Sequence, residues 1–499
     1  MADSPVALGP DVQLSSETLE QAASDPATDF ELTTAAETAL RRSREALETV
    51  HERGDPIYGL TTGFGPLVDH DAAAEPSAQG QHLLAHLSTG SGDWAAPEVV
   101  RAMVVARLQS LAQGHSAVRL STAKTLLTLL AEAPPPAVPE IGSLGASGDL
   151  TPLAHAARAY AGEGALLTDD NAPVDSGRAL AEAGLSPVSL DARDALSFVN
   201  GTSFMTGTGA LAVARAQRLL SRAEALAGWA YGLLGCSREA LAPALHEARE
   251  HEGQAESAAA IRAEADRVGS PKASRPLQEV YSLRCAPQVL GAAREQITYA
   301  RGLVETELNG VNDNPVIDPD GPDVLHGGNF QGQQVAFAAD ALNEAVTQIG
   351  VLAERQIDVL LSPDQNGGAP PLLAWSPGPT SGLAGAQLTA TALVAELRQH
   401  AQMAATSSIP TNNDNQDVVS MGALAARTAY EQTERLAPIL AILGLSLAQL
   451  THLQAADRAD GPAPAPPPWM PSVAPIKKDR PLRSEIEALA SRWRLPSRS

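Results

Sequence analysis

The feature that most limits the fold is a helical apolar pattern in the second half of the sequence. From about residue 207, apolar residues recur at three- and four-residue spacing, as in Leu219, Ala223, Leu226, Ala230 and Leu233. This spacing places the side chains on one face of a helix. Similar segments cover residues 288–307, 333–361, 381–403 and 423–453, with no strand-like alternation between them. The pattern predicts a bundle of long helices.

In the first half of the chain, glycine and proline often interrupt the helical patterns. Shorter helical patterns cover residues 34–52 and 98–113. Hydrophobic residues make up 44% of the chain but aromatic residues only 3%, a balance that favours helix over sheet. We therefore predict a mainly α protein with an N-terminal domain over residues 1–206 and a helical-bundle domain with a C-terminal extension over residues 207–499.

Predictions can also be made for four further segments of the second half. The polar residues 250–276 predict a mobile loop, and residues 461–475 predict a proline-rich connection. A short terminal helix is expected near residues 483–494. The longest apolar stretch, residues 436–450, is interrupted by Pro438, Ser446 and Gln449 and is too short for a membrane span. It predicts a buried helix.

Charge and cysteine content narrow the class of protein. The net charge of -23 argues against nucleic acid as a partner, because phosphate binding requires clustered lysine and arginine. Cys236 and Cys285 are too few for a disulfide framework or a multi-cysteine metal site, which favours a reducing compartment. The N-terminus has neither a basic nor an apolar signal region. The sequence thus predicts a cytoplasmic protein.

Residues 142–155, GSLGASGDLTPLAH, contain three small residues, Ala146-Ser147-Gly148, between glycine and Asp149. If the Gly148 amide nitrogen attacks the Ala146 carbonyl, the backbone closes an imidazolone ring. Loss of water from that carbon and from Ser147 then leaves an electrophilic alkene. Glycine is needed at the third position because a β-carbon would obstruct the approach. The alternative is a glycine-rich turn in which Ser147 or Asp149 caps a helix that starts near residue 150.

The whole string closely resembles the prosthetic-group segment of the ammonia-lyases that use methylidene-imidazolone. These are the histidine, phenylalanine and tyrosine ammonia-lyases and the related aminomutases. Further matching segments run in the same order from near Tyr58 to Gly422. The resemblance implies that Ala146, Ser147 and Gly148 form the prosthetic group inside the N-terminal domain. It also implies that no metal or diffusible cofactor is needed and that the chain forms a homotetramer with shared active sites.

Tyr58 stands in the glycine-rich segment IYGLTTGFGPL, residues 57–67. A tyrosine with a pKa near 10 is a poor base unless its surroundings stabilise the phenolate. Taken alone, Tyr58 would be interpreted as a packing residue. The segment is similar to the family's loop that bears the catalytic base, and this implies that Tyr58 removes the β-proton.

Other segments contribute residues that the resemblance places around the substrate. Asn200 in SFVNGT is implied beside the prosthetic group, with a helix cap as the alternative. Arg284 in YSLRCAPQ has the planar fork that suits a carboxylate, although a lone arginine can be a surface charge. Beside it, Tyr281 and Gln278 are implied as a catalytic and a substrate-binding polar group.

Three later segments complete the implied site. Asn314 is expected near the carboxylate, and Phe330 against the prosthetic ring, unless Phe330 only fills the core. Asn415 and Gln416 in NQDVVSMG match the amine-binding end, where the histidine-specific enzymes carry a Gln-Glu pair that is absent here.

His86-Leu87, in HLLAHLSTGSG, corresponds to the pair that contacts the substrate ring. Tyrosine-selective members carry His-Leu, phenylalanine-specific ones tend to carry an apolar pair, and histidine-specific ones carry Ser-His. His86 can hydrogen-bond a phenol that would otherwise lack a partner, at a cost of roughly 1–3 kcal/mol. The alternative is a satisfied core histidine.

The resemblance therefore implies a lyase that converts L-tyrosine to trans-p-coumarate and ammonia. A tyrosine 2,3-aminomutase uses the same group and stays open, as do phenylalanine and histidine ammonia-lyases. A non-catalytic helical scaffold is disfavoured by the intact set of polar residues.

Overall fold

The computed structural model describes residues 5–457 and 465–496. The chain divides into two compact units, each built from several segments. Unit 1 contains Met1–Leu211, Ala300–Asp340 and Met403–Arg427, and unit 2 contains Ala212–Tyr299, Ala341–Gln402 and Thr428–Ser499. A domain boundary at residue 206 stays a prediction. The mainly helical fold expected from the sequence is confirmed, because helices are the dominant elements of both units.

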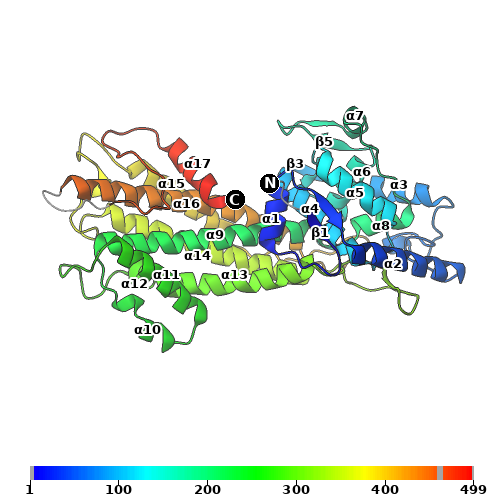
Figure 1. Cartoon of the computed structure of the whole chain (residues 1–499), viewed down its shortest axis with the longest axis horizontal. Helices are drawn as coiled ribbons and strands as arrows, with labels where there is room; N and C mark the ends of the chain where they lie inside the picture. The colour runs from blue at the N-terminus through cyan, green and yellow to red at the C-terminus, as the bar shows by residue number, and fades with distance from the viewer. Residues whose placement is uncertain (1–4, 458–464, 497–499) are drawn as a thin grey trace. The chain divides into compact units, whose positions relative to one another are not determined.

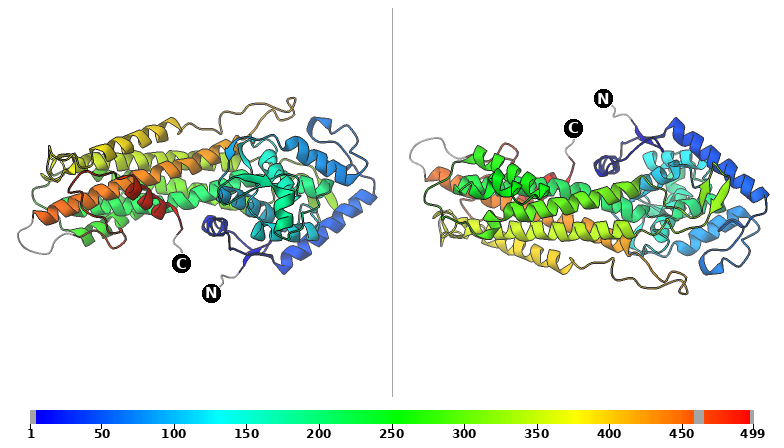
Figure 2. Two further views of the ribbon diagram at one scale, coloured as in Figure 1. Left: turned by 90° about the horizontal axis from the view of Figure 1, so that it is seen from above. Right: turned by 90° about the horizontal axis from the view of Figure 1, so that it is seen from below.

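Unit 2 is a helical bundle. Its long members are parts of α9 (Ser203–Leu234), α13 (Ala286–Leu308), α14 (Gln333–Leu361) and α16 (Gly422–Ala456), which run side by side (Figures 1 and 2). The apolar face predicted on α9 is buried, since Leu219 and Leu226 have no exposed surface. The remaining elements of the unit are η2 (Glu239–Leu241), α10 (Pro243–Glu247), α11 (Glu252–Val268), α12 (Tyr281–Arg284), η3 (Pro371–Leu373), α15 (Ala384–Gln399) and α17 (Arg483–Arg494).

The mobile loop predicted for residues 250–276 is wrong over most of its length. Residues 252–268 form α11, and only the following stretch is irregular. Ile261 and Ala265 are fully buried, and a β-carbon at Gly228 of α9 would lie 2.6 Å from the Ile261 carbonyl oxygen. The helix is held by close backbone packing against small residues, which a count of apolar residues does not detect.

The predictions for the C-terminal part of the chain concern a proline-rich connection, a terminal helix and a buried helix. Residues 461–464 of the expected proline-rich connection lie outside the described residues, and residues 465–475 have no regular structure beyond a turn. The terminal helix is confirmed as α17. Among the described residues, α16 alone is long and apolar enough to cross a membrane, and 89% of that apolar window is buried inside the protein. The predicted buried helix over residues 436–450 is therefore confirmed.

Unit 1 surrounds helix α4 (Pro97–Ala112), of which fourteen consecutive residues, Val99 to Ala112, are buried. The predicted helices over residues 34–52 and 98–113 correspond to α2 (Thr34–Glu52) and α4. The other helices of the unit are α1 (Ser16–Ser24), η1 (Gly65–Leu67), α3 (Pro76–Leu87), α5 (Leu120–Glu132), α6 (Leu150–Tyr160), α7 (Ser176–Glu182) and α8 (Ala192–Val199).

The strands of unit 1 are short and pair two by two. Strands β1 (Val6–Leu8) and β2 (Phe30–Leu32) are parallel. The three antiparallel pairs are β3 (Ser91–Trp94) with β4 (Pro139–Ile141), β5 (Ala165–Leu167) with β6 (Pro173–Asp175), and β7 (Val316–Asp318) with β8 (Asp323–Leu325). Strand β4 leads into the segment that carries Ala146-Ser147-Gly148.

Candidate active site

The Ala146-Ser147-Gly148 segment is a tight turn between β4 and α6. Gly148 has φ +68°, and a β-carbon there would lie 2.2 Å from the carbonyl oxygen of Gly201. That same oxygen accepts the Asp149 N–H at 2.7 Å. A side chain at position 148 would therefore be strained and would displace the backbone of Gly201. Glycine is required here for the close approach of two backbone segments.

The helix-cap interpretation of this segment is not supported. Helix α6 does begin at Leu150, but Asp149 makes no side-chain capping bond. Its carboxylate instead accepts the Met205 N–H at 2.8 Å and the Ser143 hydroxyl at 2.7 Å. Burial raises the pKa of Asp149 to about 7, against the opposing effect of these donors. Asp149 thus fixes the turn to the start of α9.

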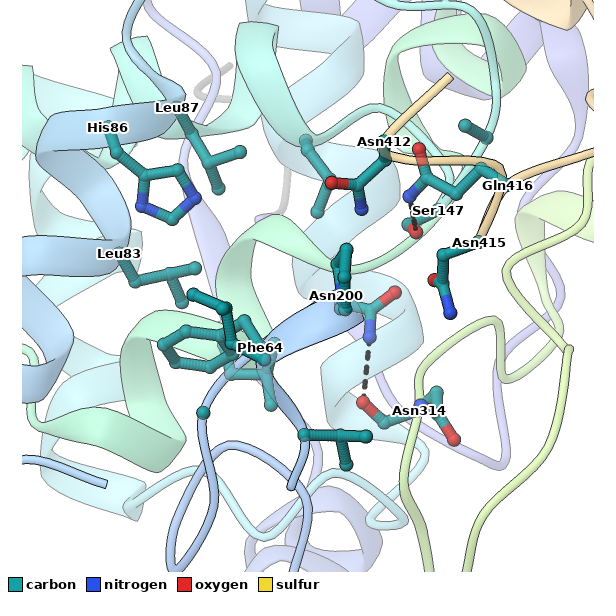
Figure 3. A pocket seen from close by; sticks show the side chains of 18 of the residues that line it. Phe64, Leu83, His86, Leu87, Ser147, Asn200, Asn314, Asn412, Asn415 and Gln416 are labelled. Atoms are coloured by element: carbon teal, nitrogen blue, oxygen red, sulfur yellow. Dashed lines mark hydrogen bonds between the residues drawn. The ribbon is translucent and has the colours of Figure 1, made fainter. Parts of the chain in front are cut away.

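The turn lines a cavity of about 870 Å³ in unit 1. Figure 3 shows His86 and Leu87 on one side of it and Ser147, Asn415 and Gln416 on the other. The cavity is lined by these sequence-predicted residues: Tyr58, His86, Leu87, Ala146, Ser147, Gly148, Asn200, Asn314, Phe330, Asn415 and Gln416. Segments that are far apart in the sequence therefore meet at one site of a size suited to a small molecule.

Tyr58 projects from the loop between α2 and η1. Its hydroxyl oxygen accepts the Gly65 N–H at 2.8 Å, and its ring meets Phe64 edge-on at 6.1 Å between centroids. Burial raises the pKa of Tyr58, and the Gly65 N–H partly opposes this effect. These surroundings of Tyr58 therefore disfavour the phenolate that a basic tyrosine requires.

Asn200 follows the last residue of α8, and its side chain does not cap the start of a helix. Its Nδ2 donates to the Asn314 carbonyl oxygen at 2.7 Å, the dashed contact between these residues in Figure 3. Its Oδ1 is buried and has no hydrogen-bond partner among the described residues. Asn200 thus turns an unused acceptor into the region beside Ser147.

Buried charged side chains fix the backbone at Asn200 and near Asn314. Arg107 donates to the Asn200 carbonyl oxygen at 3.1 Å and to Asn312 Oδ1 at 2.8 Å. Arg193 pairs with Asp313 at 2.5 Å, and both side chains are almost completely buried. Breaking a buried pair of this kind is costly, so the backbone next to Asn314 is held firmly.

His86 lies one residue before the end of α3 and is exposed to the cavity. The core-histidine alternative is therefore wrong. His86 Nδ1 lies 2.9 Å from the His82 carbonyl oxygen. Because a carbonyl can only accept, Nδ1 carries the hydrogen and Nε2 is left as an acceptor. Leu87 lines the cavity beside it.

The amine-binding candidates lie at the opposite side. Gln416 Nε2 donates to the Ser147 hydroxyl oxygen at 2.7 Å. Phe330 is partly buried and lines the cavity, so it does more than fill the core. Both residues belong to segments of unit 1 that come late in the sequence.

The structure also adds lining residues that the sequence analysis missed, among them Asn412, Phe64 and Leu83. Asn412 begins a run of three residues with φ between +55° and +58°. A β-carbon at Gly65 would lie 2.8 Å from Asn412 Nδ2, so the Tyr58 loop rests on this run. The sequence TNNDNQ carried a usable signal, because asparagine and aspartate are enriched in the left-handed region.

Three predicted residues do not line the cavity. Gln278, Tyr281 and Arg284 belong to unit 2. The Tyr281 side chain is 71% exposed, and the Arg284 guanidinium lies 4.8 Å from the centre of the Tyr281 ring.

The residues present fit a ring formed from Ala146, Ser147 and Gly148. The turn is already compressed at Gly148, where even a β-carbon would be excluded. The unpartnered Asn200 Oδ1 and the Gln416 amide provide polar groups on either side of Ser147. The chain is thus a mainly helical protein whose Ala146-Ser147-Gly148 turn lies in the wall of a cavity.

Comparison with known proteins agrees with this class. Residues 14–466 match the family described as aromatic amino acid lyase. The chain is 43% identical to the tyrosine ammonia-lyase of Cereibacter sphaeroides, covering 90% of each protein. It is 42% identical to the MIO-dependent tyrosine 2,3-aminomutase of Streptomyces globisporus, covering 85% of this chain and 82% of the relative.

The structural likeness is equally extensive. The crystal structure of tyrosine aminomutase from Streptomyces globisporus matches with a TM-score of 0.88 and 37% identity, covering 98% of this chain and 97% of that one. The chain therefore belongs to the aromatic amino acid lyase family, and it is a carbon–nitrogen lyase.

Proposed function

We propose that this enzyme converts L-tyrosine to trans-p-coumarate and ammonia. The observation that carries the proposal is the free acceptor Nε2 of His86 in the cavity, on the side away from Ser147. A substrate phenol donates to such an acceptor, whereas a phenylalanine ring leaves it unpaired. The names of the relatives that share this family support tyrosine as the substrate.

We propose that Ala146, Ser147 and Gly148 form a methylidene-imidazolone held between Asn200 and Gln416. When present, this group supplies an electrophilic alkene that makes the substrate's amino group able to leave. Phe330 packs near the ring, and Asn415 and Gln416 hold the amine end. The three residues of the turn need no diffusible cofactor for this chemistry.

The remaining steps belong to side chains. Leu87 packs against the substrate ring while His86 Nε2 accepts the phenol hydrogen. Asn314 and Arg284 hold the carboxylate. Tyr58 Oη removes the β-proton. To act as a base, Tyr58 needs a lowered pKa, whereas burial in this structure raises its pKa. The completed site must supply additional positive potential near the phenolate.

We further propose a homotetramer in which Gln278, Tyr281 and Arg284 of one subunit complete the cavity of another. Their membership of unit 2, and the exposure of Tyr281, support this arrangement. Neighbouring exposed apolar residues such as Leu277, 86% exposed, are the kind of surface that an obligate interface covers.

Complementation between two inactive variants tests the shared site. Ser147→Ala lacks the alkene source, and Tyr281→Phe lacks the Tyr281 hydroxyl. Mixed tetramers contain some sites with both groups intact, so co-expression should restore part of the activity. If the mixture stays as inactive as each parent, the shared-site proposal is refuted.

The second candidate function is a tyrosine 2,3-aminomutase, favoured by the likeness to the Streptomyces globisporus enzyme over most of the chain. Incubation with L-tyrosine separates the two. The lyase proposal expects p-coumarate and ammonia to accumulate in equal amounts, and β-tyrosine as the main product would overturn it. Histidine and phenylalanine in the same substrate panel test the other members of the family.

We also propose that the enzyme works in the cytoplasm. Cys236 and Cys285 are both free, and free thiols are most easily kept in a reducing compartment. Loss of activity on mild oxidation that a thiol reductant reverses would agree with this location. Secretion of active enzyme into the culture medium by the native host would contradict it.

A further inference from the structure

The residues from Arg275 to Cys285, here called the Tyr281 segment, alternate between exposed and buried side chains. Leu277 and Tyr281 are 86% and 71% exposed, whereas Glu279 and Leu283 are buried. Helix α12 within the segment has only four residues. A helix this short is not stabilised by its own hydrogen bonds, so side chains around it must fix its orientation.

The first anchor is the ion pair between Arg275 and Glu279. Arg275 Nε donates to Glu279 Oε1 at 2.8 Å, and a second bond joins Nη2 to Oε2. Arg275 Nη1 donates to the Gln365 carbonyl oxygen at 2.6 Å. The two side chains are only 10% and 7% exposed. A bidentate pair with so little solvent contact has a defined geometry, and Gln365 ties it to the loop after α14.

The second anchor acts on two consecutive carbonyl groups of α12. Gln356 of α14 donates its Nε2 to the Ser282 carbonyl oxygen at 2.9 Å. Tyr231 of α9 donates its hydroxyl to the Leu283 carbonyl oxygen at 3.0 Å. Both donors are buried. Because the two bonds come from different long helices, they fix both the tilt of α12 and its rotation about its axis.

The exposed side of the segment is ordered in turn. The Arg284 guanidinium lies over the Tyr281 ring at 4.8 Å, an arrangement that restrains both side chains. We infer that Tyr231, Gln356 and the Arg275–Glu279 pair are positioning residues, which hold Gln278, Tyr281 and Arg284 ready for the cavity of a neighbouring subunit. This inference rests on the proposed function, in which those three residues act in another subunit.

Preorganisation of this kind has a kinetic consequence. A displacement of about 1 Å at groups that contact the substrate can lower the rate by roughly 100-fold. Loss of one anchor should therefore affect turnover and substrate binding far more than it affects the stability of the bundle.

The test compares three variants of the full-length tetramer. Tyr231→Phe and Gln356→Met each remove one donor to α12. Gln432→Met is the matched control, because buried Gln432 makes the same type of bond, from Nε2 to the Leu397 carbonyl oxygen at 2.8 Å. For each, kcat and KM for L-tyrosine, the thermal midpoint and the mass of the Ser147 peptide are measured.

We expect Tyr231→Phe and Gln356→Met to lower kcat/KM by roughly 10- to 100-fold, with the loss of two waters at Ser147 unchanged. The control should have a similar drop in thermal midpoint but nearly full activity. If all three lose activity in proportion to their midpoints, the residues are merely structural and the inference is overturned. If Tyr231→Phe or Gln356→Met fails to fold, Arg275→Lys replaces it in the test. Lysine keeps the positive charge but cannot form both hydrogen bonds to Glu279, so we expect an intermediate loss of kcat/KM.

Tyr281→Phe separates this inference from the proposed function. If Tyr281→Phe is fully active, the role of the Tyr281 segment in the active site is itself refuted. If Tyr281→Phe is inactive while Tyr231→Phe and Gln356→Met are fully active, only the positioning role is refuted.

Discussion

Replacing His86 with phenylalanine should weaken the enzyme's preference for tyrosine over phenylalanine. In the structure, His86 Nδ1 is committed to the His82 carbonyl oxygen at 2.9 Å. The substrate's phenol can therefore donate to Nε2, and the phenylalanine variant has no acceptor at that position. The ring that replaces it suits an unsubstituted aromatic substrate instead.

The size of the change follows from the cost of an unpaired phenol. That cost is roughly 1–3 kcal/mol, which corresponds to a factor of about 5 to 150 because about 1.4 kcal/mol is tenfold. His86 is exposed to a cavity of about 870 Å³, so water can partly replace the lost bond. We therefore expect the ratio of kcat/KM values, tyrosine over phenylalanine, to fall by about tenfold, near the lower end of that range.

The assay measures kcat/KM for both amino acids in three variants. His86→Phe should show the change, and His86→Gln should keep part of the preference because a glutamine oxygen can accept. His82→Phe is the matched control, since His82 lines the same cavity one helical turn earlier and its backbone carbonyl is retained. An unchanged ratio in His86→Phe, or an equal change in His82→Phe, would refute the role of Nε2.

Three further predictions concern the turn and the base. Burial raises the pKa of Asp149 from 3.8 to about 7, so the folded state keeps a proton that the unfolded state loses, and stability falls as pH rises from about 4 to 7. Between pH 5 and 8 the free energy of unfolding should fall by roughly 2–3 kcal/mol from this group. In urea unfolding, Asp149→Asn should lack this part of the pH dependence. An identical pH dependence in the variant and the unsubstituted enzyme would contradict the prediction. Gly148→Ala should abolish the loss of two waters that mass spectrometry would detect, because the added β-carbon meets the backbone of Gly201. Gly367→Ala is the control and should retain this mass change, since Gly367 also has a positive φ, +84°, but lies in open space. An unaltered mass change in Gly148→Ala would count against the required close approach. Tyr58→Phe should keep that mass change but lower kcat by roughly 100- to 10,000-fold, and near-normal turnover would exclude Tyr58 as the base.

The helical class and eleven of the residues that line the cavity were predictable from the sequence alone. Long helices follow from periodic apolar residues, which bury the same face in any bundle, and Leu219 and Leu226 of α9 are indeed buried. The turn at Gly148 was also predictable, because a run of small residues is a local property of the chain. By contrast, α11 was missed, since its stability depends on Gly228 and other small residues distant in sequence.

How the individual side chains can act depends on contacts that form only in the folded protein. The sequence could not show that Asp149 would bind Met205 and Ser143 instead of capping α6. It could not show which nitrogen of His86 is free, because the His82 carbonyl fixes the tautomer. It also could not show that the Tyr281 side chain is 71% exposed on unit 2. These properties depend on burial and on hydrogen-bond partners from other segments, and such partners exist only once the chain has folded.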